Sequence, residues 1–287
     1  ALVHNRAIRG PRRDRQRMAT GRMPKLKRTA DEQQARRDGP EFIESLDRGL
    51  RVIQSFGADH RPMTLSDIAK ACDLPRATVR RILHTLIKAG FVAGDERLFS
   101  LTPRILTLAS AYLASNQISS VMQPLMDEVS AQAKEVCSLA ILDGAEAVFV
   151  ARASPARVFS AGIDIGYRLP AFCTSVGRVL LGRLSDEALA KAIKSARLTA
   201  QTPDTVTDKA AVIATVIADR AKGYSLVDRE AEPGFRSISV PIRRYDGGIV
   251  AAANIGAHVD RITTEEMTAR FLPLLKEMSE AAKPLLV

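Results

Sequence analysis

The hydrophobic positions of this chain divide it into two regions. Up to about residue 102, apolar residues recur at three- and four-residue spacings, which predict short amphipathic helices. After residue 117, alternating apolar and polar runs are mixed with helical spacings, which predicts strands as well as helices. A chain of 287 residues is long enough for two domains that each bury a core.

The first region begins with one predicted helix and continues as a helix-turn-helix. Ile43, Leu46, Leu50 and Ile53 mark an amphipathic helix that Gly57 can end. Two short helices joined by a tight turn then follow, and the second one is basic, which is the pattern of a helix-turn-helix.

Each helix of this pair has a recognisable start and an apolar stripe. Thr64 with Asp67 three positions later predicts a capped helix start, and Pro75 suits the first position of the second helix. Cys72 belongs to the buried stripe of the first helix. The second helix carries apolar residues at the spacing of one buried face, namely Val79, Ile82, Leu83, Leu86 and Ile87.

A predicted wing and a further helix complete the first region. Two short strands around a Gly-Asp turn, within residues 91–101, predict a hairpin, and the order of elements is that of a winged-helix DNA-binding domain. Thr102-Pro103 then starts a helix with an apolar stripe. We interpret this helix as one that links the domains and pairs with a partner chain; the alternative is a core helix of the first domain.

The second region predicts an α+β domain with an antiparallel sheet. Asp143-Gly144 is the strongest hairpin signal, and hairpin turns that join strands directly make the sheet antiparallel. A third strand is expected near 158–163, and Thr207 is expected to cap one of the helices. The predicted helices cover residues 119–135, 175–183, 185–196, 208–222 and a terminal segment after Thr263, and the later strands lie within 224–230, 235–243 and 249–257.

The predicted organisation therefore has four parts. Residues 1–40 form a disordered basic tail, 41–102 a winged-helix DNA-binding domain, 103–117 a linker and dimerisation helix, and 118–287 an effector-binding domain. The tail holds 12 Lys+Arg and 4 Asp+Glu, so it carries +8 of the net charge of +10. A DNA-contacting arm, or translation that starts at Met18 or Met23, are the alternatives for this segment.

Charge is also sorted onto one element of the first domain. No Asp or Glu occurs from Pro75 to Gly94, although residues 41–104 hold ten Lys+Arg and eight Asp+Glu. A merely solvated helix would more often mix signs, so the acid-free face favours contact with nucleic acid. The second helix of a helix-turn-helix enters the major groove. The predicted DNA-binding residues are Arg76, Thr78, Arg80, Arg81, His84 and Lys88, with Arg97 at the wing.

Several function classes have no support in the sequence. No apolar run is long enough for a membrane span, and no segment resembles a secretory signal. The three cysteines are far apart, which fits a reducing cytoplasm, and the four histidines lie in no metal spacing. No catalytic motif or phosphate loop is found, so we predict no catalytic residue, metal or cofactor. Cys173 lacks an adjacent base and is a poor candidate nucleophile.

Two features of the second region favour a small-ligand site. The stretch LPAFCTSVGRVLLG places Thr174 and Ser175 at a helix start, where a carboxylate can bind, although an ordinary helix cap is equally compatible. In the strand after Gly234, alternation puts one aromatic and two hydroxyl residues on one face, namely Phe235, Ser237 and Ser239. Asn254 and Gly256 repeat this mixture on the next strand.

These segments together resemble the IclR family of bacterial transcriptional regulators. The resemblance covers residues 41–287 and rests on SLDRGLRVIQSF, LSDIAKACDLPRATVRRILHTLIKAGFV, LPAFCTSVGRVLL and GFRSISVPIRRYDGGIVAAANIGAHVDRIT. It is most similar to the branch that controls protocatechuate, 4-hydroxybenzoate and β-ketoadipate catabolism. The family implies an N-terminal winged helix and a C-terminal effector domain related to the GAF fold, assembled as a homodimer or a dimer of dimers.

The resemblance also implies which positions line the effector site. One position is ambiguous between Val227 and Asp228, and we assign it to Asp228. The complete predicted set is Ala161, Leu169, Ser175, Val176, Asp228, Phe235, Ser237, Asn254 and Gly256.

The sequence therefore predicts a cytoplasmic transcriptional regulator. It is expected to bind double-stranded DNA at an operator and to respond to a small organic acid, with RNA polymerase as a further candidate partner and no role at a membrane. Two alternatives remain, an enzyme that acts on an aromatic or dicarboxylic acid and a protein-interaction module whose winged helix no longer reads DNA.

Overall fold

The computed structural model describes residues 41–56, 62–95, 97–115, 117–155 and 164–286. The chain divides into two compact units, one that ends at Leu101 and one that begins at Thr102. Each unit has its own hydrophobic core. The predicted tail, Gly57 and the strand expected near 158–163 lie outside the described residues.

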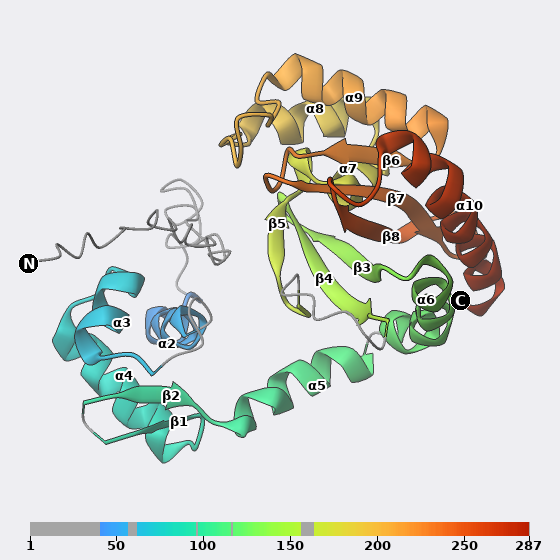
Figure 1. The fold of residues 1–287 in the computed structure, drawn as a ribbon. Coiled ribbons are helices and arrows are strands. Elements are labelled where there is room, and N and C mark those ends of the chain that lie inside the picture. Colours follow the sequence, from blue (N-terminus) through green and yellow to red (C-terminus); the bar gives the residue numbers. More distant parts are fainter. Residues whose placement is uncertain (1–40, 57–61, 96, 116, 156–163, 287) are drawn as a thin grey trace, which may run out of the picture. The chain divides into compact units, whose positions relative to one another are not determined.

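The first unit is a helix-turn-helix with a wing (Figure 1). The strands of the wing pair in antiparallel fashion, and Met63 adds a single bridge to Phe99. This arrangement confirms the winged-helix prediction. The elements are α2 Glu44–Ser55, α3 Leu65–Cys72, α4 Arg76–Lys88, β1 Val92–Gly94 and β2 Phe99–Leu101.

Local contacts set the position of α3 against its neighbours. Thr64 and Asp67 form the predicted capping box at the start of α3. The helix ends at Asp73, which adopts the left-handed conformation with φ 52° and makes the tight turn into α4. The Arg51 guanidinium of α2 donates a hydrogen bond to the carbonyl oxygen of Cys72. These contacts fix both ends of α3, the first end by its capping box and the second by the turn and the hydrogen bond from α2.

The buried face of α2 differs from the predicted one. Val52 and Phe56 pack into the core of the first unit. The expected stripe instead faces outward, since Ile43 is 63% exposed, Leu46 59% and Leu50 46%. The helix therefore has apolar residues on two sides, and only one side is covered in a single chain.

The apolar stripe of α4 is buried at its centre and open at its end. Val79 and Leu83 are fully buried, and Ile82 and Leu86 pack partly against the same core. Ile87, which was also predicted to be buried, is exposed. Pro75 is the N-cap residue of α4 rather than its first helical residue.

The second unit is an α+β domain built on one six-stranded antiparallel sheet with the order β5-β4-β3-β8-β7-β6. The antiparallel sheet confirms the predicted fold class. Its strands are β3 Val136–Asp143, β4 Glu146–Ala153, β5 Arg168–Pro170, β6 Ser225–Asp228, β7 Phe235–Arg243 and β8 Ile249–His258. Its α-helices are α5 Leu106–Ser115, α6 Ile118–Ala133, α7 Ser175–Leu181, α8 Asp186–Ser195, α9 Lys209–Lys222 and α10 Thr264–Ala282, with 3-10 turns at Pro103–Ile105, Ala171–Cys173 and Lys283–Leu285.

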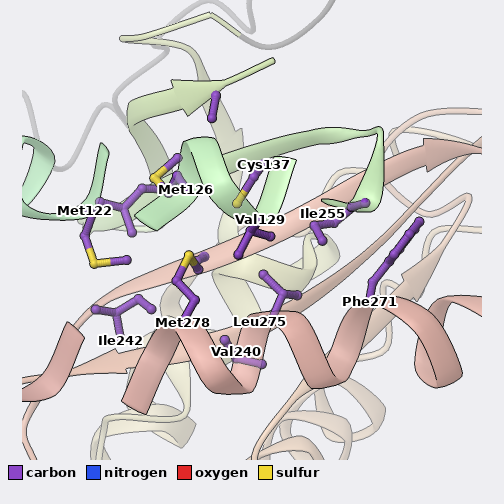
Figure 2. Close-up of a cluster of buried hydrophobic side chains, with 14 of the residues drawn as sticks. Met122, Met126, Val129, Cys137, Val240, Ile242, Ile255, Phe271, Leu275 and Met278 are labelled. Carbon is purple, nitrogen blue, oxygen red and sulfur yellow. The ribbon is translucent and has the colours of Figure 1, made fainter. Parts of the chain in front are cut away.

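The two faces of this sheet are covered by different helices. On one face, α6 and α10 bury side chains such as Met126, Val240 and Leu275 in the main core (Figure 2). On the other face, α7 packs against Ala140, Phe149 and Ala252. The pair α8 and α9 forms a further cluster with the segment before α7. The helix α7 therefore covers the second face of the sheet directly.

Two details differ from the prediction. The N-cap residue of α9 is Asp208, whose carboxylate accepts a hydrogen bond from the backbone N–H of Ala211, instead of Thr207. The short strand β5 was not predicted, because its three residues carry too little alternation to be recognised. Among the described residues, no helix combines the length and the apolar character needed to cross a membrane.

Candidate nucleic-acid interface and ligand site

The helix α4 presents its basic side chains to solvent. The burial pattern places Arg76, Arg80, Arg81, His84 and Lys88 on the exposed side of the helix. Thr78 is partly buried beside the core residue Val79. Because the sequence from Pro75 to Gly94 contains no acid, these side chains have no negative neighbour within their own helix.

The wing adds a further exposed cation, Arg97, at the tip of its hairpin. The turn before β2 is held by Asp95, whose carboxylate accepts hydrogen bonds from the backbone N–H groups of Arg97 and Leu98. Those bonds, with the one from Leu98 the larger cause, lower the pKa of Asp95. The turn therefore fixes the backbone from which Arg97 projects.

The second unit has a row of polar residues across the sheet on the side of α7, which we call the polar row. The row consists of directly paired residues on four neighbouring strands, namely Arg152, Ser138, Asn254 and Ser239. The neighbours of these residues along the strands, such as Leu139, Ile255 and Val240, point into the opposite core. The polar side chains therefore share the face that α7 covers.

A cluster of three serine hydroxyls joins α7 to β7. Ser239 donates a hydrogen bond to Ser175 over 2.6 Å, and the hydroxyls of Ser175 and Ser237 lie 2.7 Å apart. Ser175 and Ser239 are fully buried, whereas Ser237 is partly exposed. Three hydroxyl protons serve two internal hydrogen bonds, so one proton remains for donation to a ligand.

Asn254 carries an unsatisfied polar atom on this face. Its side chain is 7% exposed, and its Oδ1 atom is buried with no hydrogen-bond partner among the described residues. An unsatisfied buried polar group of this kind costs about 1–3 kcal/mol. Asn254 lies between Ser138 and Ser239 in the polar row, so its oxygen faces the same side of the sheet as their hydroxyls.

Four of the predicted lining residues lie on the same face of the sheet or on the helix that covers it. Val176 is buried in the cluster beneath α7, and Leu169 of β5 packs against the same cluster. The ring of Phe235 lies over Gly256, where a Cβ atom would come within 2.6 Å of the ring. Gly256 therefore makes room for Phe235, which is partly exposed at the edge of the face.

The assignment of Asp228 is corrected by the structure. Val227 is the residue paired with Ser237, and it is buried on the side of α7. Asp228 lies on the opposite face, where its carboxylate accepts a 3.0 Å hydrogen bond from Arg236. Of the remaining predicted positions, Ala161 lies outside the described residues.

The start of α7 behaves as a capped helix. Thr174 accepts a hydrogen bond from the backbone N–H of Gly177 and donates one to the carbonyl of Pro170, so its hydroxyl is already used. Gly177 is required for the close approach of α7 to the preceding turn, since a Cβ atom there would lie 2.2 Å from the backbone of Ala171. The hydroxyl of Ser175, rather than that of Thr174, is the group turned toward the sheet.

A buried ion pair that sequence reasoning missed holds α7 in place. Arg178 donates one hydrogen bond to Glu230 over 2.8 Å and another to the carbonyl of Phe172 over 2.9 Å. The same Glu230 oxygen accepts a hydrogen bond from the backbone N–H of Val206. The pair therefore ties the helix that carries Ser175 to the loop that precedes Phe235. A lone arginine in an apolar run was its only signal in the sequence.

Burial keeps the two cysteine thiols of the second unit in their protonated form. Burial raises the pKa of the Cys137 thiol to about 12, and it raises the pKa of the Cys173 thiol to about 12 as well. Within the described part of the chain, no group of three or more His, Cys, Asp or Glu side chains is placed to hold a metal ion.

Comparisons with known proteins assign both units to one family. The model of the IclR helix-turn-helix domain matches residues 45–96, and that of the bacterial transcriptional regulator IclR C-terminal domain matches residues 110–283. The Pca regulon regulatory protein of Pseudomonas putida is 43% identical over 237 residues, which cover 82% of this chain and 81% of that protein.

Two solved structures similar to this chain contain an aromatic acid. An IclR homolog from Microbacterium hydrocarbonoxydans, complexed with 4-hydroxybenzoate, is 26% identical with a TM-score of 0.71 and covers 84% of this chain and 98% of that one. The inducer-binding domain of a double mutant of the transcription factor PobR from Acinetobacter, complexed with 3-hydroxybenzoic acid, is 32% identical with a TM-score of 0.56 and covers 58% and 98%, respectively.

Proposed function

Because this chain belongs to the IclR family of bacterial transcriptional regulators, we propose that it binds its operator through α4 and responds to an aromatic hydroxy acid held at the polar row. The chain is a DNA-binding regulator whose activity is modulated by a ligand. Its relatives are named as regulators and not as enzymes, which argues against the enzyme alternative.

The exposed face of α4 supports the assignment of the DNA contacts. Its N-terminal half carries Arg76, Thr78 and Arg80, which would reach base edges or nearby phosphates in the major groove. Arg81, His84 and Lys88 lie further along the helix, and Arg97 would reach a neighbouring phosphate from the wing. A bidentate contact from arginine to guanine contributes about 1–3 kcal/mol of discrimination.

The buried, unpartnered oxygen of Asn254 is the observation that carries the proposed ligand class. It needs a hydrogen-bond donor, and the serine cluster offers one donor in return. A hydroxybenzoate supplies a hydroxyl donor, a carboxylate acceptor and an aromatic ring that suits Phe235, Val176 and Leu169. The aromatic acids in the two similar structures support the same class.

We further propose that the chain works as a homodimer or a dimer of dimers. A single helix contacts too few base pairs to be selective. A dimer contacts two symmetric half-sites and therefore twice as many base pairs. The outward apolar residues of α2 and the exposed Leu106 and Leu108 of α5 are suited to pairing with a second copy. Sedimentation velocity of the purified chain measures this assembly directly, and a monomer at micromolar concentration contradicts it.

Two measurements on the purified protein test the proposed function. A thermal-shift panel of 4-hydroxybenzoate, 3-hydroxybenzoate, protocatechuate and β-ketoadipate identifies the ligand, since a ligand bound only by the folded state raises the melting temperature. Fluorescence anisotropy with a duplex selected from a random library then measures operator affinity. The active acid is expected to change this affinity about 5- to 150-fold. No shift with any aromatic acid contradicts the ligand class.

A further inference from the structure

We propose that Arg152 binds the carboxylate of the effector, and that Asp164 is the internal counter-ion that this carboxylate replaces. The inference rests on the proposed function, because it assigns one end of the acid within the same ligand site. Neither residue belongs to the predicted lining set.

A β-bulge turns Arg152 toward the ligand face. Ala147 and Phe149 of β4 point toward α7, so regular alternation would send Ala151 to that side as well. The pairing with β3 shifts between Leu139 and Ala140, and Ala151 lies in the opposite core. Bulges commonly re-aim a side chain near a functional site. This one places Arg152 beside Ser138 in the polar row.

Arg152 supplies the positive charge of the polar row, whose other members are uncharged. Arg152 and Asn254 stand two strands apart in that row, which corresponds to about 10 Å between their backbones. A planar acid with a carboxylate at one end and a hydroxyl at the other can therefore meet Arg152 and Asn254 at once. A guanidinium matches a carboxylate with two parallel hydrogen bonds.

The acidic partner of Arg152 is easy to replace. Arg152 pairs with Asp164 over 2.8 Å, and the side chains are 16% and 78% exposed. An ion pair with such an exposed member contributes about 0–1 kcal/mol, because water and salt solvate the acid well. Asp164 can thus leave Arg152 at little cost when another carboxylate arrives.

Arg178, a second arginine near this face among the described residues, is not available for a ligand. Arg178 and Glu230 are 4% and 11% exposed, and Glu230 also holds the backbone of Val206. Removing a buried partner of this kind leaves an uncompensated charge. Of these two arginines, only Arg152 has a counter-ion that an incoming acid can displace.

The experiment compares an acid with its neutral amide. Titration calorimetry measures the affinity of wild type, Arg152→Gln and Asp164→Asn for 4-hydroxybenzoate and for 4-hydroxybenzamide. We expect Arg152→Gln to weaken binding of the acid about tenfold or more and to leave binding of the amide unchanged. We expect Asp164→Asn to strengthen binding of the acid about two- to fivefold, because the competitor is removed.

Arg168→Gln is the matched control. Arg168 is a half-buried arginine on the neighbouring strand, paired with Glu146 and Asp143. Its partner Glu146 points away from α7, so this variant should bind the acid as wild type does. Equal loss of acid and amide binding in Arg152→Gln, or no loss of acid binding, overturns the proposal. Asp164→Asn, at an exposed position, provides a second test that does not depend on the packing of Arg152.

The outcome also separates this inference from the proposed function. If wild type binds an aliphatic dicarboxylate in place of hydroxybenzoates, the proposed ligand class is wrong, and the same variants are compared with that acid and its amide. If wild type binds an aromatic acid but Arg152→Gln binds it equally well, only the role of Arg152 is wrong. If no acid in the set binds, both proposals are overturned.

Discussion

The four cations of α4 are exposed to solvent, whereas the polar row on the sheet of the second unit is largely buried. The exposed cations keep their hydration until a polyanion replaces it, so binding draws on the release of counterions and depends on salt. The buried serines and Asn254 are already desolvated, so a ligand gains from fixed hydrogen-bond partners. The first surface is suited to a large, highly charged partner and the second to a small one.

This contrast leads to a difference in how the two units tolerate substitution. Removing a charge from α4 should alter binding and leave stability nearly unchanged. Removing a buried charge such as Arg178 from the second unit should alter stability first, because its partner Glu230 stays behind in a medium of low polarity.

The largest expected effect comes from breaking the buried ion pair. Arg178→Met leaves Glu230 without its counter-charge, and we expect the free energy of unfolding to fall by about 3–5 kcal/mol. Urea denaturation followed by circular dichroism measures the loss. The double variant Arg178→Met/Glu230→Met should recover much of it, and Arg168→Met, at a more exposed ion pair, should cost about 1 kcal/mol or less. Equal losses at Arg178 and Arg168 would contradict the contrast.

High pH should weaken the second unit through its buried thiols. Burial raises the pKa of Cys137 and Cys173 from 9.0 to about 12, so the unfolded chain loses these protons at lower pH than the folded one. The stabilisation is complete below pH 9 and is lost as the pH rises from 9 toward 12, by about 1.4 kcal/mol per pH unit for each thiol. Urea unfolding at pH 8, 9 and 10 should show the onset of this loss, which steepens as the pH passes 9, and a Cys137→Ala/Cys173→Ala variant should lose less stability over the same range.

A base contact from α4 should contribute less than either of these effects. Arg80→Ala is expected to weaken operator binding by about 1–3 kcal/mol and to flatten sequence preference at one position. Its unfolding free energy should stay within about 0.5 kcal/mol of wild type. The control is Lys88→Ala, which should weaken all duplexes evenly and lower the salt slope by about one. If Arg80→Ala binds its operator as tightly and as selectively as wild type, Arg80 does not contact bases in the major groove.

The smallest effect is a gain in stability. Asn254→Leu replaces the unpartnered oxygen with an apolar group of similar size, so the ligand-free protein should become more stable by about 1 kcal/mol. The same variant should lose the thermal shift caused by the active acid. Ser138→Ala, at the neighbouring position of the polar row, is the comparison. A loss of stability in Asn254→Leu would mean that the oxygen is satisfied in solution.

Patterns that depend on one element were predicted well. The alternation along residues 235–243 placed Ser237 and Ser239 on one face, and the structure has both on the side of α7. The capping boxes at Thr64 and Thr263 were also predicted, because the sequence signal of a capping box lies within four consecutive residues.

Features that depend on two distant elements were missed. The register between β6 and β7 is set by a turn in which Arg229 has φ 60°, and a slip of one residue exchanges Val227 for Asp228 on the ligand face. The partner of Arg178 lies 52 residues away, at Glu230, so no local spacing reveals the pair. The bulge that turns Arg152 is likewise invisible without the neighbouring strand.

The second face of α2 shows a different limit. Ile43, Leu46 and Leu50 form a helical stripe as regular as that of a buried helix, yet all three are exposed in a single chain. Apolar periodicity predicts that a helix face is buried. It does not predict whether the same chain or a second chain buries that face.

The exposed carboxylate opposite Arg152 also bears on the concentration at which this regulator responds. Under the proposed role of Arg152, the effector must compete with Asp164 for the guanidinium, so weakly binding acids at low concentration would not displace the aspartate. Because that aspartate faces water, its replacement by a neutral or a shorter residue would move the detection threshold without disturbing the packed interior. A substitution at this one surface position would thus change the effector concentration that the protein needs.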